Sequence, residues 1–444
     1  MRLLMMTWEY PPNVVGGLSR HVYYLSKALA RSGVEVHVLT QGQHDGASDE
    51  AGGGVNVHRA SSVNICPPDF LAGVLQMNLS LLSRGYELFE ETGGFDIIHA
   101  HDWLVGLPGR MLKHRFKVPL VATIHATEAG RNHGIHNELQ RYISDVEWWT
   151  TYEAWRVICC SNSMKREVMS LFSLPGDKVH VVPNGVEPNE FVAAHDGVAR
   201  IEYAAPDEGI IFYVGRLVQE KGVQILLSAL RTLVDWGKKA KLVVAGTGPF
   251  EHQLKQIASS LGIAHHVYFT GHVPDVVRNK LYRWADVAVF PSLYEPFGIV
   301  ALEAMAAGCP VVVSDAGGFP EVVTDGVNGL VAHAGDVRHL ASKIAELMDN
   351  RGYAANLAKN AAQLVHTKYL WSKVAEDTLK VYSEVLDLYR QSGWGMPDVR
   401  KGGKRKDARS ADGRGRGFPV EAPYLQHTQT PGSGGQPAGD GTHH

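Results

Sequence analysis

Two glutamates show the clearest chemistry in the sequence. Glu295 and Glu303 lie eight residues apart, on either side of a Pro-Phe-Gly turn. The apolar run at residues 286–290 predicts a buried strand, and the Ala-rich segment from Gly298 predicts a helix that carries Glu303. In a helix, this spacing corresponds to about 12 Å at roughly 1.5 Å per residue. Because a carboxylate accepts several hydrogen bonds, the pair could hold both ends of one hydroxyl-rich ligand, with free helix N–H groups between them.

A second stretch, V-G-R-L-V-Q-E-K-G, combines two cations with a predicted helix start. A strand ends at Gly215, Arg216 lies in the following loop, and Lys221 comes just before the helix. Cations beside free helix N–H groups attract a diphosphate without a metal ion. We therefore expect Arg216 and Lys221 to bind a diphosphate.

The N-terminal turn Y-P-P-N-V-V-G-G is a third candidate site. Gly16 and Gly17 lie between a predicted strand and a predicted helix, where glycine lets the backbone approach a phosphate. A Gly-Gly pair also suits a tight structural turn, and the residues alone leave both interpretations open.

Histidines and acids follow two neighbouring predicted strands. His99, His101 and Asp102 end the first, and His125 and Glu128 follow the second. Such residues could form a metal site or could simply bond loop carbonyls. The sequence has no histidine pair four residues apart on a predicted helix and no D-x-D motif to hold a divalent ion on a diphosphate. We therefore expect no metal site.

Short β-branched runs alternate with longer amphipathic runs, which predicts parallel sheets with crossover helices. The turn at residues 183–185 and the polar stretch up to residue 209 divide this pattern into two series. The sequence thus predicts an α/β fold with two doubly wound, Rossmann-like domains facing across a cleft, at residues 1–190 and 191–367. The predicted strands span residues 2–7, 34–39, 95–100, 119–124, 156–161 and 178–182, then 210–214, 241–245, 266–270, 287–291, 311–314 and 329–332. The predicted helices include residues 19–31, 71–91, 138–155, 223–236, 249–261, 276–285 and 298–307.

The C-terminal part of the chain changes character twice. Residues 368–390 predict one more long amphipathic helix. Residues 391–444 are rich in glycine, basic and polar residues and predict a disordered tail. Its basic part, residues 400–416, could contact an anionic surface or could only keep the chain soluble.

Composition excludes several classes of protein. The 444 residues are 45% hydrophobic and 20% charged, as in ordinary soluble globular proteins. A net charge of -3 argues against a general nucleic-acid binder. The four cysteines lack zinc-finger spacing, which favours a reduced, cytoplasmic protein. No apolar run approaches the roughly 18 residues of a membrane-spanning helix, and the short run after Arg2 fits a first buried strand better than a signal peptide.

The string E-P-F-G-I-V-A-L-E at residues 295–303 resembles the E-x7-E signature of retaining glycosyltransferases of family 4, which have two Rossmann domains in the B-type architecture. The G-R-x-x-x-x-K-G element, the Gly-Gly loop and the H-D-W element resemble further motifs of that family, so the resemblance covers residues 1–389. The N-terminal string is especially similar to glycogen-synthase-like members. Val14 stands where classical bacterial starch and glycogen synthases have lysine, which weakens a specific assignment of ADP-glucose.

The resemblance implies a role for each motif on the donor side. Arg216 and Lys221 would hold the nucleotide diphosphate and stabilise it as it leaves. Glu295 would bind the donor sugar, and Glu303 the ribose. Backbone groups would complete the donor site: Gly16 and Gly17 at the phosphates and sugar, His272 and Val273 at the base, and Phe297, Gly298 and Ile299 at the sugar.

The resemblance also implies an acceptor side in the first domain. Asp102 of the H-D-W element would face the acceptor, and His125 would lie against the reacting sugar. The first domain would carry the acceptor, the second the nucleotide sugar, and the helix at 368–390 would cross back to the first domain. The loop at residues 128–140, rich in Gly, His and Asn, would suit donor or acceptor binding.

We therefore expect a retaining hexosyltransferase that moves a hexose, in the first instance glucose, from a nucleotide-diphosphate sugar to a carbohydrate acceptor such as an α-glucan. The catalytic residues would be Arg216, Lys221, Glu295, His125 and Asp102. The base could be that of an ADP-, UDP- or GDP-hexose, and neither a metal nor a cofactor would be needed.

Three alternatives stay open. A mannosyl- or glucosyltransferase could act on a lipid or small-molecule acceptor. A nucleotide-sugar epimerase is disfavoured by the E-x7-E spacing. A non-catalytic nucleotide-sugar-binding protein is a further alternative, against which Arg216, Lys221 and both glutamates argue.

Overall fold

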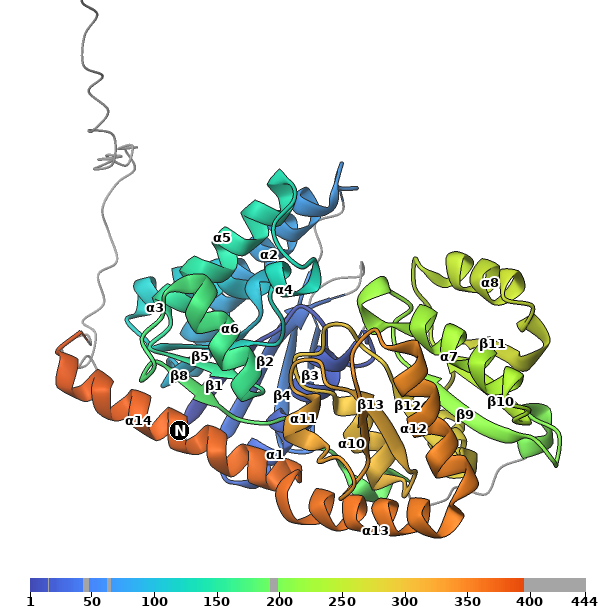
Figure 1. Cartoon of the computed structure of the whole chain (residues 1–444). Coiled ribbons are helices and arrows are strands. Elements are labelled where there is room, and N and C mark those ends of the chain that lie inside the picture. The colour runs from blue at the N-terminus through green and yellow to red at the C-terminus, as the bar shows by residue number, and fades with distance from the viewer. Residues whose placement is uncertain (15, 43–47, 62–64, 192–198, 395–444) are drawn as a thin grey trace, which may run out of the picture. The chain divides into compact units, whose positions relative to one another are not determined.

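Two sheets organise the chain, and most of their strands are buried. The computed structural model describes residues 1–14, 16–42, 48–61, 65–191 and 199–394 (Figure 1). The first sheet contains β1 (Arg2–Met6), β2 (Glu35–Gln41), β3 (Ser48–Gly52), β4 (Val55–Ala60), β5 (Ile97–His101), β6 (Leu120–Ile124), β7 (Arg156–Cys159) and β8 (Val179–Val181). The second contains β9 (Gly209–Val214), β10 (Ala240–Ala245), β11 (Val267–Gly271), β12 (Val287–Phe290), β13 (Val311–Ser314) and β14 (Leu330–Ala332).

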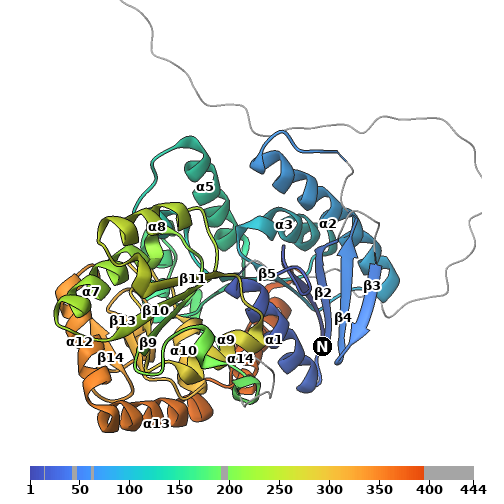
Figure 2. The ribbon, with the colours of Figure 1, turned by 90° about the vertical axis from the view of Figure 1, so that its right-hand side faces the viewer.

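Helices connect these strands in the way that parallel strands require. Those of the first half are α1 (Gly17–Arg31), α2 (Phe70–Thr92), α3 (Gly106–Phe116), α4 (Glu128–Arg131), α5 (Glu138–Glu153) and α6 (Asn162–Phe172). The rest are α7 (Val223–Asp235), α8 (Glu251–Ser260), α9 (Asp275–Trp284), α10 (Ile299–Ala306), α11 (Phe319–Val322), α12 (Val337–Asp349), α13 (Arg351–Lys368) and α14 (Trp371–Ser392). In Figure 2, α7, α8, α12 and α13 surround the second sheet, while β2, β4 and β3 form one side of the first.

The strand orders confirm the predicted pair of doubly wound α/β sheets. They run β3-β4-β2-β1-β5-β6-β7-β8 and β11-β10-β9-β12-β13-β14, and every pairing is parallel except that of β3 with β4. The order reverses between β1 and β5 in the first sheet and between β9 and β12 in the second. Ligands of such sheets bind beyond the carboxyl ends of the strands at these reversals. We therefore expect the ligand-binding residues in the loops after β1, β5, β9 and β12. They hold Gly16, Asp102, Arg216 and Glu295.

Several elements were missing from the prediction. The strands β3 and β4 extend the first sheet, α3, α6 and α12 pack on strands that the sequence did locate, and α13 packs on α10 and α12. The helix α3 was not predicted because its first turn contains Gly106, Pro108 and Gly109, which normally disfavour a helix, although proline is tolerated in the first turn. Most of the predicted tail, residues 395–444, lies outside the described residues.

The last helix packs on the half of the chain to which it is not adjacent in sequence. Val374, Tyr382 and Val385 of α14 share a buried cluster with Leu3 of β1 and Val22 of α1. Figure 1 shows α14 running beside the first sheet after α13 has followed the second. Burial of such side chains stabilises by about 1.5–3 kcal/mol each, so α14 ties its own end of the chain to the first sheet. Within the described residues, no helix is both long enough and apolar enough to cross a membrane.

One glycine allows the two loops that carry Lys221 and Glu295 to meet. Gly222 has φ 71° at the start of α7, and a Cβ added there would lie 2.0 Å from the carbonyl oxygen of Pro291. A side chain at this position would therefore both strain the backbone and push the two loops apart.

We predict that Gly222→Ala destabilises the protein far more than Gly237→Ala. Gly237 has a similar φ of 77°, but a Cβ there would meet nothing within 4 Å. In the control, the free energy of unfolding should therefore fall only by the conformational cost of about 1 kcal/mol. In Gly222→Ala it should fall by about 3 kcal/mol or more, because a backbone carbonyl must also move. Denaturant unfolding of both variants measures this, and equal losses would show that the close approach to Pro291 does not matter.

Candidate active site

An ion pair joins the two loops at the reversal of the second sheet. Lys221 ends the short 3-10 helix η4 (Gln219–Lys221) after β9, and its Nζ lies 2.7 Å from Oε2 of Glu295 in the loop after β12. Ser292 donates a hydrogen bond to the same carboxylate oxygen at 3.2 Å. The backbone N–H of Leu293 donates to the carbonyl of Glu220 at 2.7 Å, which holds the loops in register. The structure thus brings together the predicted diphosphate cation and the predicted sugar ligand.

Arg216 lies at the carboxyl end of β9 with its side chain exposed. Its backbone is fixed, because the hydroxyl of Tyr213 donates to its carbonyl oxygen at 3.2 Å. Its guanidinium has no hydrogen-bond or ion-pair partner within the part of the chain that the structure describes, so its donors face solvent. A fork of free N–H donors is well suited to an anion with several oxygens.

Glu303 is buried in α10 and is already paired with cations. Its Oε2 accepts a hydrogen bond from the hydroxyl of Tyr282 at 3.2 Å, and its Oε1 lies 3.7 Å from the guanidinium groups of both Arg20 and Arg278. Arg20 comes from α1 of the first half and also pairs with Asp275 at 2.5 Å. The sequence did not predict the three partners of Glu303, because none of them lies near Glu303 along the chain.

The start of α10 is shaped by Gly298 and by burial of its neighbour. Gly298 has φ 101°, and a Cβ there would lie 2.3 Å from the ring of Phe319. The side chain of Phe297 is buried, so only its backbone can serve a ligand. A Cβ on Gly17 would lie 3.5 Å from Cδ1 of Ile299, so the N-termini of α1 and α10 approach each other.

The N-terminus of α1 already binds an internal carboxylate. Buried Glu9 accepts hydrogen bonds from the N–H groups of Gly16 at 3.3 Å and Ser19 at 3.2 Å. A phosphate at these N–H groups would have to displace Glu9. The sequence signal for this contact was the acid in the W-E-Y string, which lies where a loop after β1 can turn back on the helix.

Asp102 and His125 are held together by the backbone. Asp102 has φ 62°, and its Oδ1 accepts a hydrogen bond from the N–H of His125 at 2.7 Å. Burial raises the pKa of Asp102 to about 6 and lowers the pKa of His125 to about 3. At neutral pH, His125 is therefore an uncharged imidazole that can donate or accept one hydrogen bond per nitrogen.

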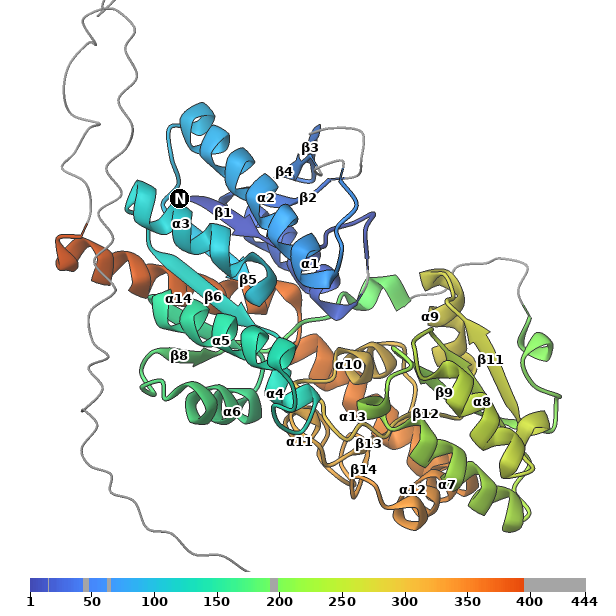
Figure 3. The same cartoon turned by 90° about the horizontal axis from the view of Figure 1, so that it is seen from above.

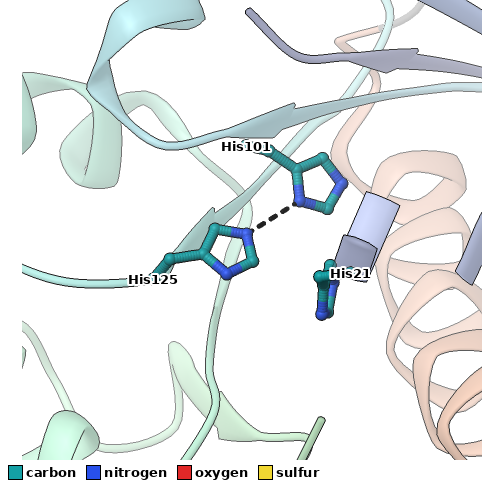
Figure 4. Close-up of side chains that lie close together, drawn as sticks. All are labelled: His21, His101 and His125. Carbon is teal, nitrogen blue, oxygen red and sulfur yellow. Dashed lines mark hydrogen bonds between the residues drawn. The ribbon is translucent and has the colours of Figure 1, made fainter. Parts of the chain in front are cut away.

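Two further histidines surround His125. Nδ1 of His101 lies 3.1 Å from Nε2 of His125, and the ring of His21 lies edge-on to His125 with centroids 4.6 Å apart (Figure 4). His21 was not selected from the sequence, because it lies inside a predicted helix and not directly after a strand. Its i+4 offset from Gly17, in a helix that starts at the site, is the signal that could have found it.

Buried acids line the segment that follows His125. Glu147 of α5 accepts the N–H of Glu128 through both carboxylate oxygens, at 2.9 and 3.1 Å, and burial raises its pKa to about 8. Tyr294 reaches this segment from the second half: its hydroxyl accepts the N–H of Thr127 at 3.3 Å and donates to Glu167 at 3.0 Å. The loop after β6 is thereby attached to the loop that carries Glu295.

His272 and Val273 follow β11, the edge strand of the second sheet, whereas Arg216 and Glu295 follow the central strands β9 and β12. The loops are connected: the N–H of Gly246 donates to the carbonyl of Gly271 at 2.8 Å, and a Cβ on Gly246 would lie 2.0 Å from the carbonyl oxygen of Gly215. His272 is exposed, and Val273 packs against the buried hydrophobic cluster that contains the strands of the second sheet. A separate cavity of about 260 Å³ beside Tyr24 and Trp371 is lined by none of the predicted site residues.

The sequence matches two glycosyltransferase families in succession. Residues 15–190 match the family described as Glycosyltransferase Family 4, and residues 199–364 match Glycosyl transferases group 1. An uncharacterized glycosyltransferase of Methanocaldococcus jannaschii is 38% identical over 393 residues, covering 87% of this chain and 99% of that protein. This chain belongs to the family 4 glycosyltransferases. The glycogen synthase of Mycobacterium tuberculosis is also 38% identical to this glycosyltransferase over 400 residues, covering 86% of this chain and 94% of that enzyme.

Solved structures agree with the fold of this glycosyltransferase. Sucrose-phosphate synthase from Thermosynechococcus elongatus is similar with a TM-score of 0.75 and 23% identity, over 87% of this chain and 99% of that one. Anabaena HepE in complex with UDP-glucose has a TM-score of 0.68 and 20% identity, over 86% of this chain and 100% of that one. The expected B-type architecture is thus confirmed.

We predict that Glu147→Gln removes a pH dependence from stability. The pKa of Glu147 is raised from an ordinary 4.5 to about 8, so the folded state holds a proton that the unfolded state loses. Stability is therefore lost as pH rises from about 4.5 through about 8. Glutamine stays neutral and keeps an acceptor oxygen for the N–H of Glu128, so the variant should match wild type at pH 5 and be more stable at pH 8–9.

The measurement is the free energy of unfolding at several pH values, for this variant and for Asp145→Asn. Asp145 is an exposed acid on the same helix, and its replacement should leave the pH slope in place. A difference between Glu147→Gln and wild type that did not change with pH would contradict the assignment.

Proposed function

We propose that this glycosyltransferase is a retaining, metal-independent hexosyltransferase that moves glucose from a nucleotide-diphosphate sugar to a carbohydrate acceptor, in the manner of glycogen synthases. The observation that carries the proposal is the Lys221–Glu295 ion pair at the reversal of the second sheet, with the unpaired guanidinium of Arg216 on the preceding loop. The cation can bind a diphosphate, and the neighbouring carboxylate can accept hydrogen bonds from a sugar attached to it.

The donor would replace internal partners one by one. The diphosphate takes Lys221 and Arg216, which frees Glu295 to accept hydrogen bonds from sugar hydroxyls. The amides of Phe297, Gly298 and Ile299 would hold the sugar, and Glu303 would exchange an arginine contact for the ribose hydroxyls. Gly16 and Gly17 would meet the phosphates once Glu9 moves, and the backbone of His272 and Val273 would meet the base. HepE, a structural neighbour, was solved with UDP-glucose, which supports a nucleotide-sugar donor.

The reaction would proceed on one face of the sugar. The bond from the anomeric carbon to the diphosphate oxygen breaks, and its electron pair stays on the diphosphate, where Arg216 and Lys221 stabilise the charge. The acceptor hydroxyl oxygen forms its bond on the same face, and its proton passes to the departing diphosphate. His125, uncharged at neutral pH, would bond a sugar hydroxyl, and exclusion of water by the acceptor-side residues would limit hydrolysis.

The acceptor side favours a neutral, hydroxyl-rich molecule. Asp102, Glu128 and Glu147 gather there around one arginine, Arg131, which lies 3.5 Å from Glu128. Glu147 holds a proton at neutral pH, so Asp102 and Glu128 carry the negative charge. Carboxylates accept hydrogen bonds from sugar hydroxyls but repel an acceptor phosphate. Together with the similarity to a glycogen synthase, this supports an α-glucan over a phosphorylated small molecule. Four free cysteines support a reducing, cytoplasmic compartment.

We predict that the enzyme turns over at least one of ADP-, UDP- and GDP-glucose with an oligoglucan acceptor, and keeps its full activity in EDTA. Proton NMR of the product should show the same anomeric configuration as the donor. The panel should include GDP-mannose and small-molecule acceptors such as a sugar phosphate and an inositol. Inversion, or activity abolished by EDTA and restored by a metal ion, would overturn the mechanism, and tight donor binding without turnover would favour the binding-protein alternative.

We predict that Lys221→Ala lowers kcat by about 10²–10³-fold, the usual effect of removing one donor that stabilises developing charge. Its thermal midpoint should fall only moderately, because Glu295 loses its cation while the loop stays held by backbone bonds. Lys255→Ala is the matched control, since Lys255 forms an exposed ion pair with Glu251 within α8. Equal losses of activity and stability in Lys221→Ala would contradict its role.

A further inference from the structure

Three imidazoles from three separate elements gather at one point of the first half. His21 comes from α1, His101 ends β5 and His125 follows β6 (Figure 4). Each offers one ring nitrogen, and these nitrogens all lie within 4.8 Å of one another. Nδ1 of His101 and Nε2 of His125 are 3.1 Å apart. With Zn–N bonds of about 2.0–2.1 Å, two nitrogens on a tetrahedral zinc ion are about 3.3 Å apart, so this pair already has nearly the right spacing.

His21 is held in the state that a metal ion requires. Its Nδ1 lies 2.6 Å from Oδ1 of Asn184, which is itself buried. An amide oxygen only accepts hydrogen bonds, so Nδ1 carries the hydrogen and Nε2 keeps its lone pair. This Nε2 is buried and has no hydrogen-bond partner among the described residues. Histidine ligands are typically oriented by such a bond at the other ring nitrogen.

A buried lone pair without a partner is unusual, because nearly all buried polar groups are hydrogen-bonded. The neighbouring His99 shows the ordinary arrangement: its two nitrogens bond the hydroxyls of Tyr382 at 2.6 Å and Thr123 at 2.7 Å. His21, in contrast, leaves its Nε2 without a hydrogen-bond partner in the part of the chain that the structure describes. The cluster is therefore less satisfied than a purely structural group of histidines next to it.

We propose that His21, His101 and His125 bind one divalent transition-metal ion, in the first instance Zn²⁺, and that the bound ion withdraws His125 from the donor sugar. Imidazole nitrogens are suitable ligands for zinc, copper and nickel but not for magnesium or calcium. The ion binds Nε2 of His21, Nδ1 of His101 and Nε2 of His125, and a fourth position stays open for water. No proton is released, because the hydrogen shared between His101 and His125 moves to the other nitrogen of its ring.

Access and closure are both feasible. His125 is half-buried whereas His21 and His101 are buried, so the ion enters from the side of His125. The ring nitrogens, which lie within 4.8 Å of one another, must come closer by up to about 1.5 Å to reach the spacing of about 3.3 Å on a zinc ion. Rotation of the His125 side chain can supply this movement. Metal binding at this site inhibits the enzyme, and the ion takes no part in the transfer reaction.

The test is a titration of the full chain with Zn²⁺ alone, in competition with a chromophoric chelator. The wild-type protein should bind one equivalent of Zn²⁺ tightly. His21→Ala should lose about 100-fold or more in affinity, and Asn184→Ala about 10–100-fold, as expected for an orienting partner. His99→Gln and His333→Ala are the controls: the first removes a buried, fully bonded neighbour, the second an exposed histidine beside Asp315. Both should keep the tight equivalent.

Two further readouts separate metal binding from folding and from activity. Circular dichroism and thermal midpoints of each variant show whether it is folded, and Co²⁺ should give visible d–d absorption in wild type but not in His21→Ala. Absence of a tight equivalent in folded wild type, or unchanged affinity in His21→Ala, would overturn the site. The inhibition rests on the proposed function: Zn²⁺ should inhibit glucosyl transfer by wild type but not by His21→Ala. Zinc that binds without inhibiting the transfer would contradict the inhibitory role. If no donor is turned over at all, the titration still decides on the site.

Discussion

The ion pair between Lys221 and Glu295 holds together the part of the structure on which the proposed chemistry depends. At 2.7 Å, with Glu295 mostly buried, each charge is the main partner of the other. Removing one partner of a buried pair leaves an uncompensated charge that costs about 3–5 kcal/mol when burial is complete. If the donor diphosphate takes Lys221 as we propose, the sugar hydroxyls would have to satisfy Glu295 in its place. This coupling would favour a whole nucleotide sugar over a free nucleotide.

The same loops attach the second half of the chain to the first. Tyr294, next to Glu295, bonds Thr127 and Glu167, and Arg20 of α1 pairs with Asp275 and approaches Glu303. Figure 3 shows α6 beside α11, where Glu321 accepts the N–H groups of Asn162 and Ser163, both at 2.8 Å. The contacts between the halves thus lie next to the residues that we assign to the donor. Binding of the ribose by Glu303 would weaken its contact with Arg20, so donor binding and contact between the halves are linked.

The fold, and the positions at strand ends of the residues that we propose for the site, could be predicted from sequence because they depend on local patterns. Buried strands followed by Gly, Arg, Asp or Glu identify the carboxyl ends of parallel strands, and the reversals in strand order then bring Asp102, Arg216 and Glu295 to the right edges. β3 was missed because S-D-E-A-G has no apolar alternation and forms only as the antiparallel edge of β4. β4 was missed although its V-N-V start alternates as a strand should.

The partners of the site residues could not be predicted, because they come from elements far away in the chain. Glu9 on the N-terminus of α1, Tyr282 on Glu303 and His21 beside His125 follow from packing of the elements on one another. Several predicted ligand groups are therefore engaged internally, and the donor binding that we propose would require their exchange.

A crystal structure of the protein with a non-transferable nucleotide sugar, such as a 2-fluoro analogue of the donor it turns over, tests this exchange most directly. We expect Nζ of Lys221 and the guanidinium of Arg216 to contact the diphosphate, Glu295 to accept hydrogen bonds from sugar hydroxyls, and Glu303 to accept them from the ribose. A diphosphate bound elsewhere, with the Lys221–Glu295 pair still intact at its present distance, would contradict this expectation.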